Sequence, residues 1–451
     1  MTKALTPILF LFHCLLCAQP IESALFPNEN VVNLGEVHND DEDFAEFEKL
    51  NDILEGVEVV MLGEQSHGEA TAYQTKIKLI KYLHEEMGFD ILAFESGLYD
   101  CRKAWKLMND GMDVREAMAK SIFYIWSATE EFEPLAAYIS ETRESQNELV
   151  LHGFDSQFAG SFSKGFLLPD FTEYLSQIDS FLLDSLEEKH LLESLGLMLE
   201  YNQKELKKRD VAQDIECLNT LIEKGKVESV EWEYFQQILV NINTYLTSVA
   251  FKEDNRDMQM AENLLWLRAQ YPDEKIICWG ATSHFLYHSE TVHMKSMLIR
   301  MLGGNYYKDQ RMMGDYIKEA LGDKVFTLGF VAYEGEYGLN RQADLKTPKE
   351  NTLEHELAKL DGDNLLINFK GLKLPDMPSR PLGNFYMVND ITHVMDAVIF
   401  NRVMERPKLD WDFANDVYEI ESKDDHRQKR TESDGDSKKK KKVIKEESPE
   451  E

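Results

Sequence analysis

Cysteine is scarce in this sequence, and its placement excludes two classes of small-protein architecture. Only five cysteines occur among 451 residues, and Cys14 and Cys17 lie close to the N-terminus. The remaining three, Cys101, Cys217 and Cys278, form neither a CxxC pair nor the Cys/His spacing of a zinc ribbon. The sequence therefore predicts buried thiols and argues against a disulfide framework.

Basic residues and long apolar runs are also few. The chain has 49 lysines and arginines against 82 aspartates and glutamates, which gives a net charge of −33. This charge repels phosphate backbones and anionic lipid headgroups, so no nucleic-acid partner is expected. After the N-terminal region, no stretch approaches the ~20 apolar residues that a membrane span requires. A hydrophobic content of 43% nevertheless suffices for a sizeable core.

The two ends of the chain differ from its body. Residues 1–24 combine Lys3, an apolar stretch from Ile8 to Cys17 and small residues such as Ala24, which is the pattern of a signal peptide. We therefore expect a secreted or periplasmic protein, with membrane attachment only if Cys17 carries a lipid anchor. Residues 421–451 hold ten acidic and ten basic residues and almost no large apolar side chains. This composition predicts a disordered charged tail.

The body, residues 25–420, alternates strand and helix patterns. The expected strands are residues 57–62, 91–94, 149–152, 275–279, 325–330, 365–368 and 397–400. The expected helices between or after them include residues 71–87, 315–321 and 352–359. Such alternation predicts an α/β fold with a mostly parallel central sheet flanked by helices.

Between about residues 160 and 250 this alternation lapses. Long patterns of helical periodicity take its place, for example over residues 176–201 and 231–246. We expect a helical insertion that caps the sheet.

Ionisable residues follow four of the expected strands. Ligands of an open parallel sheet bind outside the carboxyl ends of its strands, so residues just after those ends converge. The residues in question are Glu64 and His67 after the first strand, Glu95 after the second, Asp155 after the third and His284 after the fourth. Imidazole can take a proton from water, and an adjacent carboxylate fixes its tautomer. His67 is the preferred base, because Glu64 lies in the same tight turn.

Other chemistries fit the sequence less well. Glycine-rich phosphate loops are not found, and the segment GEQSHG has one residue too many for a nucleophile elbow at Ser66. HExxH is missing, but the spacing of His284 and His288 would place two imidazoles on one helix face, and Glu64 and His67 could add ligands. No cofactor is expected, although a divalent metal remains an open alternative.

At these loops the sequence resembles the erythromycin esterase family, hydrolases of macrolide lactone rings. The resemblance spans about residues 57–400 and rests on an ordered set of segments: VVMLGEQSHG, LAFESGLYDCRKA, Trp126, HGFDSQ, Arg256-Asp257 with Met260, Ala261 and Asn263, KIICWGATSH and MGDYIKEALGDKVFTLGF. It implies that His67 is the general base, with Glu64 and Glu95 beside it. The later loop of the family usually holds two histidines, whereas this sequence keeps His284 and has Ala281 at the first position.

These observations predict an exported hydrolase that cleaves a carboxylic ester or lactone of a small molecule. In this interpretation Glu64 and Glu95 orient His67, and His284 stabilises the oxyanion. The side chains expected to contact the substrate are Ser66, Trp126, Asp155 and Arg256. Two alternatives stay open: a metal-dependent hydrolase that uses the same residues, and a non-catalytic exported small-molecule-binding protein or lipoprotein, which Ala281 favours.

Overall fold

The computed structural model describes residues 25–37, 44–225, 229–294, 307, 310–410 and 413. The predicted signal peptide, with Cys14 and Cys17, and the predicted charged tail lie outside these residues. Within them, no helix combines the length and the apolar character needed to cross a membrane. Cys101, Cys217 and Cys278 are free and buried, which confirms the prediction for these thiols.

A nine-stranded sheet forms the centre of the described chain, in the order β1-β9-β12-β7-β2-β5-β3-β4, with β8 attached to β7. The main strands are β1 (Val31–Asn33), β2 (Val59–Glu64), β3 (Ile91–Gly97), β4 (Val150–Asp155), β5 (Ile276–Ala281), β7 (Val325–Tyr337), β8 (Ala343–Asp344), β9 (Asn364–Asn368) and β12 (Ala397–Met404). All neighbours from β12 to β4 pair in parallel, whereas β9 and β1 pair antiparallel. The predicted α/β fold with a mostly parallel sheet is confirmed.

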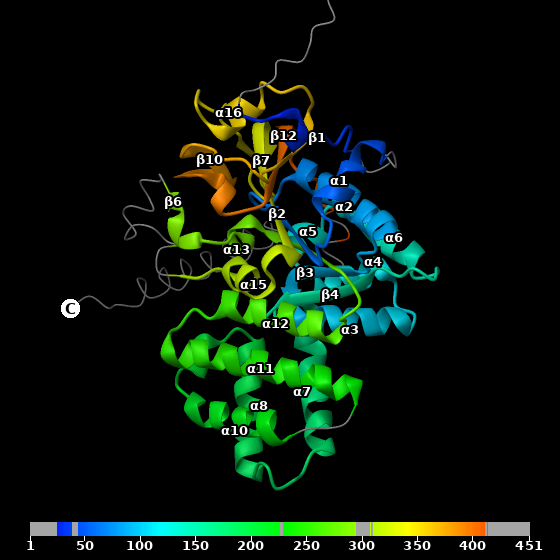
Figure 1. The fold of residues 1–451 in the computed structure, drawn as a ribbon. Helices are drawn as coiled ribbons and strands as arrows, with labels where there is room; N and C mark the ends of the chain where they lie inside the picture. Colours follow the sequence, from blue (N-terminus) through cyan, green and yellow to red (C-terminus); the bar gives the residue numbers. More distant parts are fainter. Residues whose placement is uncertain are drawn as a thin grey trace, which may run out of the picture.

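The central strands read as continuous apolar runs because helices cover both faces of a parallel sheet. Every residue of β2, β3 and β9 is buried. Figure 1 shows the helices that flank the sheet. Those of the first half are α1 (Lys49–Ile53), α2 (Ala70–Met87), α3 (Leu98–Asn109), α4 (Val114–Ser121), α5 (Tyr124–Ser127) and α6 (Glu133–Thr142). Those of the second half are α12 (Arg256–Gln270), α13 (Thr282–Phe285), α15 (Met313–Leu321) and α16 (Leu353–Leu357).

Helix α2 illustrates how local sequence sets the limits of an element. Its end was predicted from Gly88, and Gly88 indeed adopts a left-handed conformation with φ +66° while its N–H bonds the carbonyl of Leu83. Glycine adopts this conformation without the steric cost that a Cβ would add. The helix therefore ends at Met87, and β3 begins three residues after Gly88, at Ile91.

The helices between β4 and α12 form a group apart from the sheet, in green in the lower part of Figure 1. They are α7 (Ser161–Gln177), α8 (Ser185–Leu199), α9 (Gln203–Leu206), α10 (Val211–Lys224) and α11 (Val230–Phe251). The pattern over residues 176–201 predicted one helix, but α7 ends at Gln177 and α8 starts at Ser185. The break occurs because Asp184 and Glu187 form a capping box that starts a new helix.

A small antiparallel sheet was not predicted. It consists of β10 (Met377–Leu382), β11 (Phe385–Asn389) and β6 (His293–Met294), in the order β10-β11-β6. Pro378 and Pro381 lie within β10, and proline is depleted in strands because it cannot donate to the hydrogen-bond ladder. The sequence of β10 therefore carries little strand signal.

The strand order places the candidate site. β2 and β3 are separated along the chain only by α2, yet β5 lies between them in the sheet. The register aligns Trp279 of β5 with Leu62 on one side and Phe94 on the other. Glu64, Glu95 and Ala281 therefore lie at about the same level at the carboxyl edge. α/β sheets bind ligands in the crevice at the carboxyl ends of the strands, at the point where the strand order reverses.

Candidate active site

His67 and Glu64 form the first half of the site. Glu64 is the last residue of β2, and the next turn brings His67 Nδ1 to 2.7 Å from Glu64 Oε1. The His67 side chain is 47% exposed, whereas that of Glu64 is fully buried. A carboxylate at Nδ1 fixes the ring orientation and leaves Nε2 as the nitrogen that can accept a proton.

The Glu64 carboxylate is held from several sides. Lys76 Nζ lies 3.0 Å from Oε2, and the Trp126 indole N–H donates to both oxygens at 2.8 and 2.9 Å. Burial acts to raise the pKa of Glu64, but Lys76, His67 and Trp126 outweigh it and hold the pKa below its usual range. Burial likewise acts to lower the pKa of His67, but Glu64 and Glu95 raise it. The pair therefore favours a carboxylate beside an imidazole of increased basicity.

Lys76 is the residue of this half that sequence reasoning missed. Its side chain is fully buried, donates to the Gly280 carbonyl at 3.2 Å and lies 4.7 Å from the centroid of the Trp279 ring. Burial lowers its pKa, while the charge of Glu64 opposes that effect. A signal was present, since Lys76 lies among buried residues of α2 next to Ile77 and four residues before Ile80, where a lysine needs a buried partner.

The carboxyl ends of β3 and β4, which carry Glu95 and Asp155, form the second half around Arg256. This first residue of α12 donates to Asp155 through Nε at 3.2 Å and Nη2 at 2.7 Å, and to Glu95 Oε1 at 3.0 Å. Glu95 Oε2 also accepts the backbone N–H of Ala281 at 2.8 Å. β3, β4, β5 and α12 are thus connected by charge-assisted hydrogen bonds.

His284 is wedged between two carboxylates. Its Nδ1 lies 2.8 Å from Asp257 Oδ1 and its Nε2 lies 3.3 Å from Glu95 Oε1. Burial acts to lower the pKa of His284, but Glu95 and Asp257 raise it to about 9. At neutral pH this imidazole is protonated, so it donates hydrogen bonds, and His67 is the histidine suited to act as a base. Asp257 was noted in the sequence only as part of the family resemblance, without a role.

Two glycines permit the loops to approach so closely. A Cβ at Gly63 would lie 2.5 Å from Thr282 Oγ1 and 2.9 Å from Thr282 Cα. A Cβ at Gly280 would lie 2.9 Å from Glu95 Oε2. Glycine at both positions therefore lets β2 and β5 end against the neighbouring side chains of the site.

The buried carboxyl group of Glu69 stabilises the turn that carries His67. Glu69 is fully buried, accepts the Ser66 backbone N–H at 3.2 Å and accepts Asn384 Nδ2 at 3.3 Å. Asn384 lies in the β10–β11 turn and also accepts the Gln65 side-chain amide. Burial and the charge of Glu64 raise the pKa of Glu69 to about 8. Sequence reasoning missed this support because Asn384 is more than three hundred residues away.

We expect Glu69→Gln to stabilise the protein at alkaline pH. Below pH 4.5 the carboxyl is protonated in both folded and unfolded chains, but between 4.5 and about 8 only the unfolded chain ionises it. Stability is therefore lost as pH rises through that window, and glutamine removes the loss, on the order of 4 kcal/mol at pH 8. Urea unfolding at pH 5 and pH 8 measures the difference. An equal effect at both pH values would contradict this account of Glu69.

The structure places the residues predicted to bind substrate in different environments. Trp126 is fully buried against Glu64, and the Asp155 side chain is fully buried against Arg256. Arg256 is 27% exposed and Ser66 is partly exposed in the His67 turn. Substrate contact by these residues stays a prediction, and the bonds of Trp126 and Asp155 indicate that they position Glu64 and Arg256.

The spacing of His284 and His288 does not correspond to one helix face. Helix α13 ends at Phe285, and His288 has φ +50° with a side chain that is 64% exposed beside Glu290. Among the residues that the structure describes, no three or more His, Cys, Asp or Glu side chains are grouped so that they could hold a metal ion. Metal dependence stays a matter for experiment.

Comparison with known proteins identifies the family of this chain. The model of the family described as Erythromycin esterase matches residues 84–401. The chain belongs to the erythromycin esterase family. The matched range includes Glu95, Asp155, Arg256 and His284, and it begins within α2, after the His67 turn.

Two proteins with related sequences have names that describe an activity. The chain is 29% identical to the putative hydrolase YbfO of Bacillus subtilis (strain 168) over 310 residues, which are 63% of this chain and 67% of that protein. It is 20% identical to erythromycin esterase type II of Escherichia coli over 414 residues, which are 80% of this chain and 93% of that protein. These names and the family support a hydrolase.

Solved structures share the fold. A Bacillus cereus protein has a TM-score of 0.68 at 16% identity, covering 84% of this chain and 96% of its own. A mutant of the erythromycin esterase EreC in its open conformation has a TM-score of 0.61 at 18% identity, covering 82% of this chain and 96% of its own. The predicted resemblance to erythromycin esterases is confirmed.

Proposed function

We propose that this member of the erythromycin esterase family hydrolyses a carboxylic ester or lactone of a small molecule with a water activated by His67. The observation that carries the proposal is the 2.7 Å bond from Glu64 to Nδ1 of a half-exposed His67 ring. The buried ion pair of Glu64 with Lys76 keeps the carboxylate charged. The ring is therefore oriented, made more basic and left accessible to water.

The chemistry proceeds in two proton transfers. Water attacks the carbonyl carbon and gives a proton to His67 Nε2, which forms a tetrahedral oxyanion. The charge of the resulting imidazolium is balanced by Glu64. His67 then returns the proton to the alkoxide as the carbon–oxygen bond breaks, and a carboxylic acid and an alcohol leave. No covalent enzyme intermediate is needed.

The oxyanion has two cationic neighbours in the second half of the site. His284 is protonated at neutral pH, although both of its nitrogens face carboxylates. Arg256 uses Nε and Nη2 for Asp155 and Glu95, and its Nη1 lies 3.5 Å from His284 Nε2. We assign oxyanion stabilisation to the positive charge of His284 and to Nη1 of Arg256, which bonds no described carboxylate and can serve as the hydrogen-bond donor. One well-placed donor of this kind is worth about 3–4 kcal/mol in the barrier.

A panel of esters and lactones tests the proposal. The purified full chain is assayed with each compound before and after chelation, and elemental analysis reports bound metal. Turnover that survives chelation supports the water mechanism, whereas loss of turnover on chelation supports the metal-dependent alternative. No turnover together with a compound that raises the Tm would favour a binding protein.

The pH dependence of the rate provides a second test. Only neutral His67 can accept a proton, and Glu64 raises its pKa above 6.5. We expect kcat/KM to rise with pH through a midpoint above 6.5. In Glu64→Gln the midpoint should move down, and kcat/KM should fall by about 10²-fold or more because the base loses its orienting charge. An unchanged midpoint in that variant would refute the role of Glu64.

We also propose that the protein is exported, on the basis of the pattern over residues 1–24. Expression in a host with a secretory pathway, followed by mass spectrometry of the mature N-terminus, tests this. Cleavage near Ala24 supports export, a lipid-modified Cys17 supports anchoring, and an intact Met1 in the cytosol contradicts both.

A further inference from the structure

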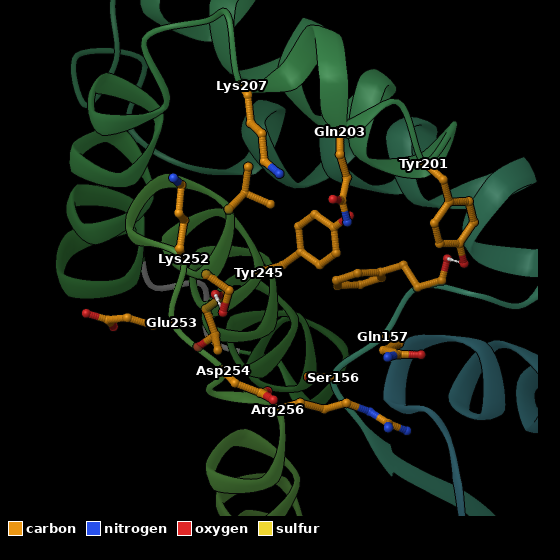
Figure 2. A pocket seen from close by; sticks show the side chains of 14 residues that line it. Ser156, Gln157, Tyr201, Gln203, Lys207, Tyr245, Lys252, Glu253, Asp254 and Arg256 are labelled. Atoms are coloured by element: carbon orange, nitrogen blue, oxygen red, sulfur yellow. Dashed lines mark hydrogen bonds between the residues drawn. The ribbon is translucent and has the colours of Figure 1, made fainter. Parts of the chain in front are cut away.

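A cavity of about 480 Å³ lies between the carboxyl edge of the sheet and the helical group α7–α11 (Figure 2). Four segments supply its walls: the loop after β4, the region from the end of α8 to α9, the last turns of α11 and the α11–α12 loop. None of these segments carries a residue of the His67 turn. The cavity is therefore a compartment beside the reacting groups.

Arg256 connects this cavity to the site. It lines the cavity, and its guanidinium bonds Glu95 and Asp155 next to His284. Ser156 and Gln157, which follow Asp155 directly, line the cavity as well. A substrate with its ester at the carboxyl edge can therefore place its distal part in the cavity, past Arg256.

One part of the lining is apolar and preorganised. It consists of Phe158, Tyr201, Tyr245 and Val249. The Tyr201 hydroxyl donates to the Phe158 carbonyl at 3.0 Å, which fixes these two residues together. The hydroxyl oxygen of Tyr245 is buried and has no hydrogen-bond partner among the described residues.

The charged part of the lining contains two available cations. Lys207 and Lys252 line the cavity, and neither makes an ion pair with a described residue. Lys164 adds positive charge nearby, because its Nζ lies 5.7 Å from the centroid of the Tyr201 ring. The chain has a net charge of −33, so acidic partners for lysines are abundant. Two lysines at one cavity without an ion pair to a described residue are therefore unusual in this protein.

Two acidic residues share the rim and have to be weighed against these lysines. Glu253 accepts Asn255 Nδ2 at 3.2 Å, and Figure 2 shows its carboxylate directed away from the aromatic side chains. Asp254 lies at the edge next to Arg256 in the same view. In the same view Lys207 descends from the opposite wall toward Tyr245, and Lys252 lies above Glu253 with its amine pointing away from the Glu253 carboxylate. The acidic groups therefore leave the lysine side of the cavity positive.

We propose that this cavity binds the distal part of the substrate, and that this part is an apolar chain or ring that ends in a carboxylate. The apolar lining would contact the chain or ring, and Lys207 and Lys252 would form ion pairs with the carboxylate. The inference rests on the proposed function and narrows it to anionic esters. It also explains how an acidic protein selects an anionic compound, since the positive charge is local to the cavity.

Matched esters test this proposal. We would compare 4-nitrophenyl hexanoate with mono-4-nitrophenyl adipate, which has the same acyl length and a terminal carboxylate, and repeat the comparison with the eight-carbon pair, octanoate and suberate. We expect kcat/KM to be at least 10-fold higher for the anionic member of one pair. Lys207→Glu and Lys252→Glu should each lower the ratio of kcat/KM for the anionic ester to kcat/KM for its neutral partner about 10-fold.

Lys204→Glu is the matched control, because Lys204 is exposed on α9 outside the cavity lining. Equal cleavage within both pairs, or an equal loss in Lys204→Glu, would overturn the proposal. Calorimetric binding of the same four esters to His67→Asn gives a readout without turnover. Tighter binding of the anionic esters there, lost in His67→Asn/Lys207→Glu, supports the cavity assignment even if wild-type turnover is absent, which would reject only the proposed hydrolysis.

Discussion

Replacement of His67 by alanine is expected to lower kcat/KM for ester hydrolysis by about 10²–10⁴-fold, the usual contribution of a positioned general base. The loss arises because, of the two carboxylate-bound imidazoles at the site, only His67 is half exposed to solvent, whereas His284 is 15% exposed. His284 cannot substitute, since Glu95 and Asp257 raise its pKa to about 9 and keep it protonated. In this variant the attacking water would have no general base, although the positive charges of His284 and Arg256 would remain.

The fold should tolerate this change. The His67 side chain is 47% exposed and its one bond is to Glu64, which keeps Lys76 and Trp126 as partners. We therefore expect circular dichroism and Tm to stay close to those of the wild type. His288→Ala is the control, because that side chain is 64% exposed and lies outside the site. Wild-type turnover in His67→Ala would reject the mechanism.

Lys76→Met is expected to be the most destabilising of the site substitutions. Methionine fills the space but leaves the fully buried Glu64 carboxylate without its counter-charge. Breaking a buried ion pair in this way costs about 3–5 kcal/mol. The remaining Glu64 should bind a proton more readily, so the basicity of His67 and the rate of hydrolysis should fall as well.

A double variant separates charge from packing. In Lys76→Met/Glu64→Gln neither charge is buried, so most of the lost stability should return while hydrolysis stays low. Urea unfolding measures the free energies, and Lys224→Met, the same substitution at an exposed position of α10, is the control. If the single variant Lys76→Met unfolds at the wild-type urea concentration, the ion pair does not carry the role assigned to it.

The elements of the sheet could be read from the sequence because their signals are local. Val59–Glu64, Ile91–Gly97 and Ile276–Ala281 each begin with an apolar run of four residues that is followed by glycine or an acid, and each strand was predicted within a few residues. The break between α7 and α8 was missed because periodicity alone does not register a capping box. The β10–β11 hairpin was missed because its prolines weaken the strand pattern.

The supporting residues of the site were harder to find. Lys76 and Trp126 lie twelve and 62 residues from Glu64, and each has an ordinary role as a helix residue or a core aromatic. Glu69 depends on Asn384, which a turn between two unpredicted strands brings to it. The roles of these residues follow from their burial beside a charged group, and the spacing of residues in the sequence does not reveal that burial.

The sequence by itself determined the parallel α/β sheet and the residues at its carboxyl edge, because hydrophobic periodicity and strand ends are properties of neighbouring residues. Only the tertiary structure decided that β5 lies between β2 and β3, that Lys76 and Trp126 bind Glu64, and that His284 is held between Glu95 and Asp257. The reason is physical: protonation and hydrogen bonding depend on distance and burial, and those quantities exist only once the chain has folded.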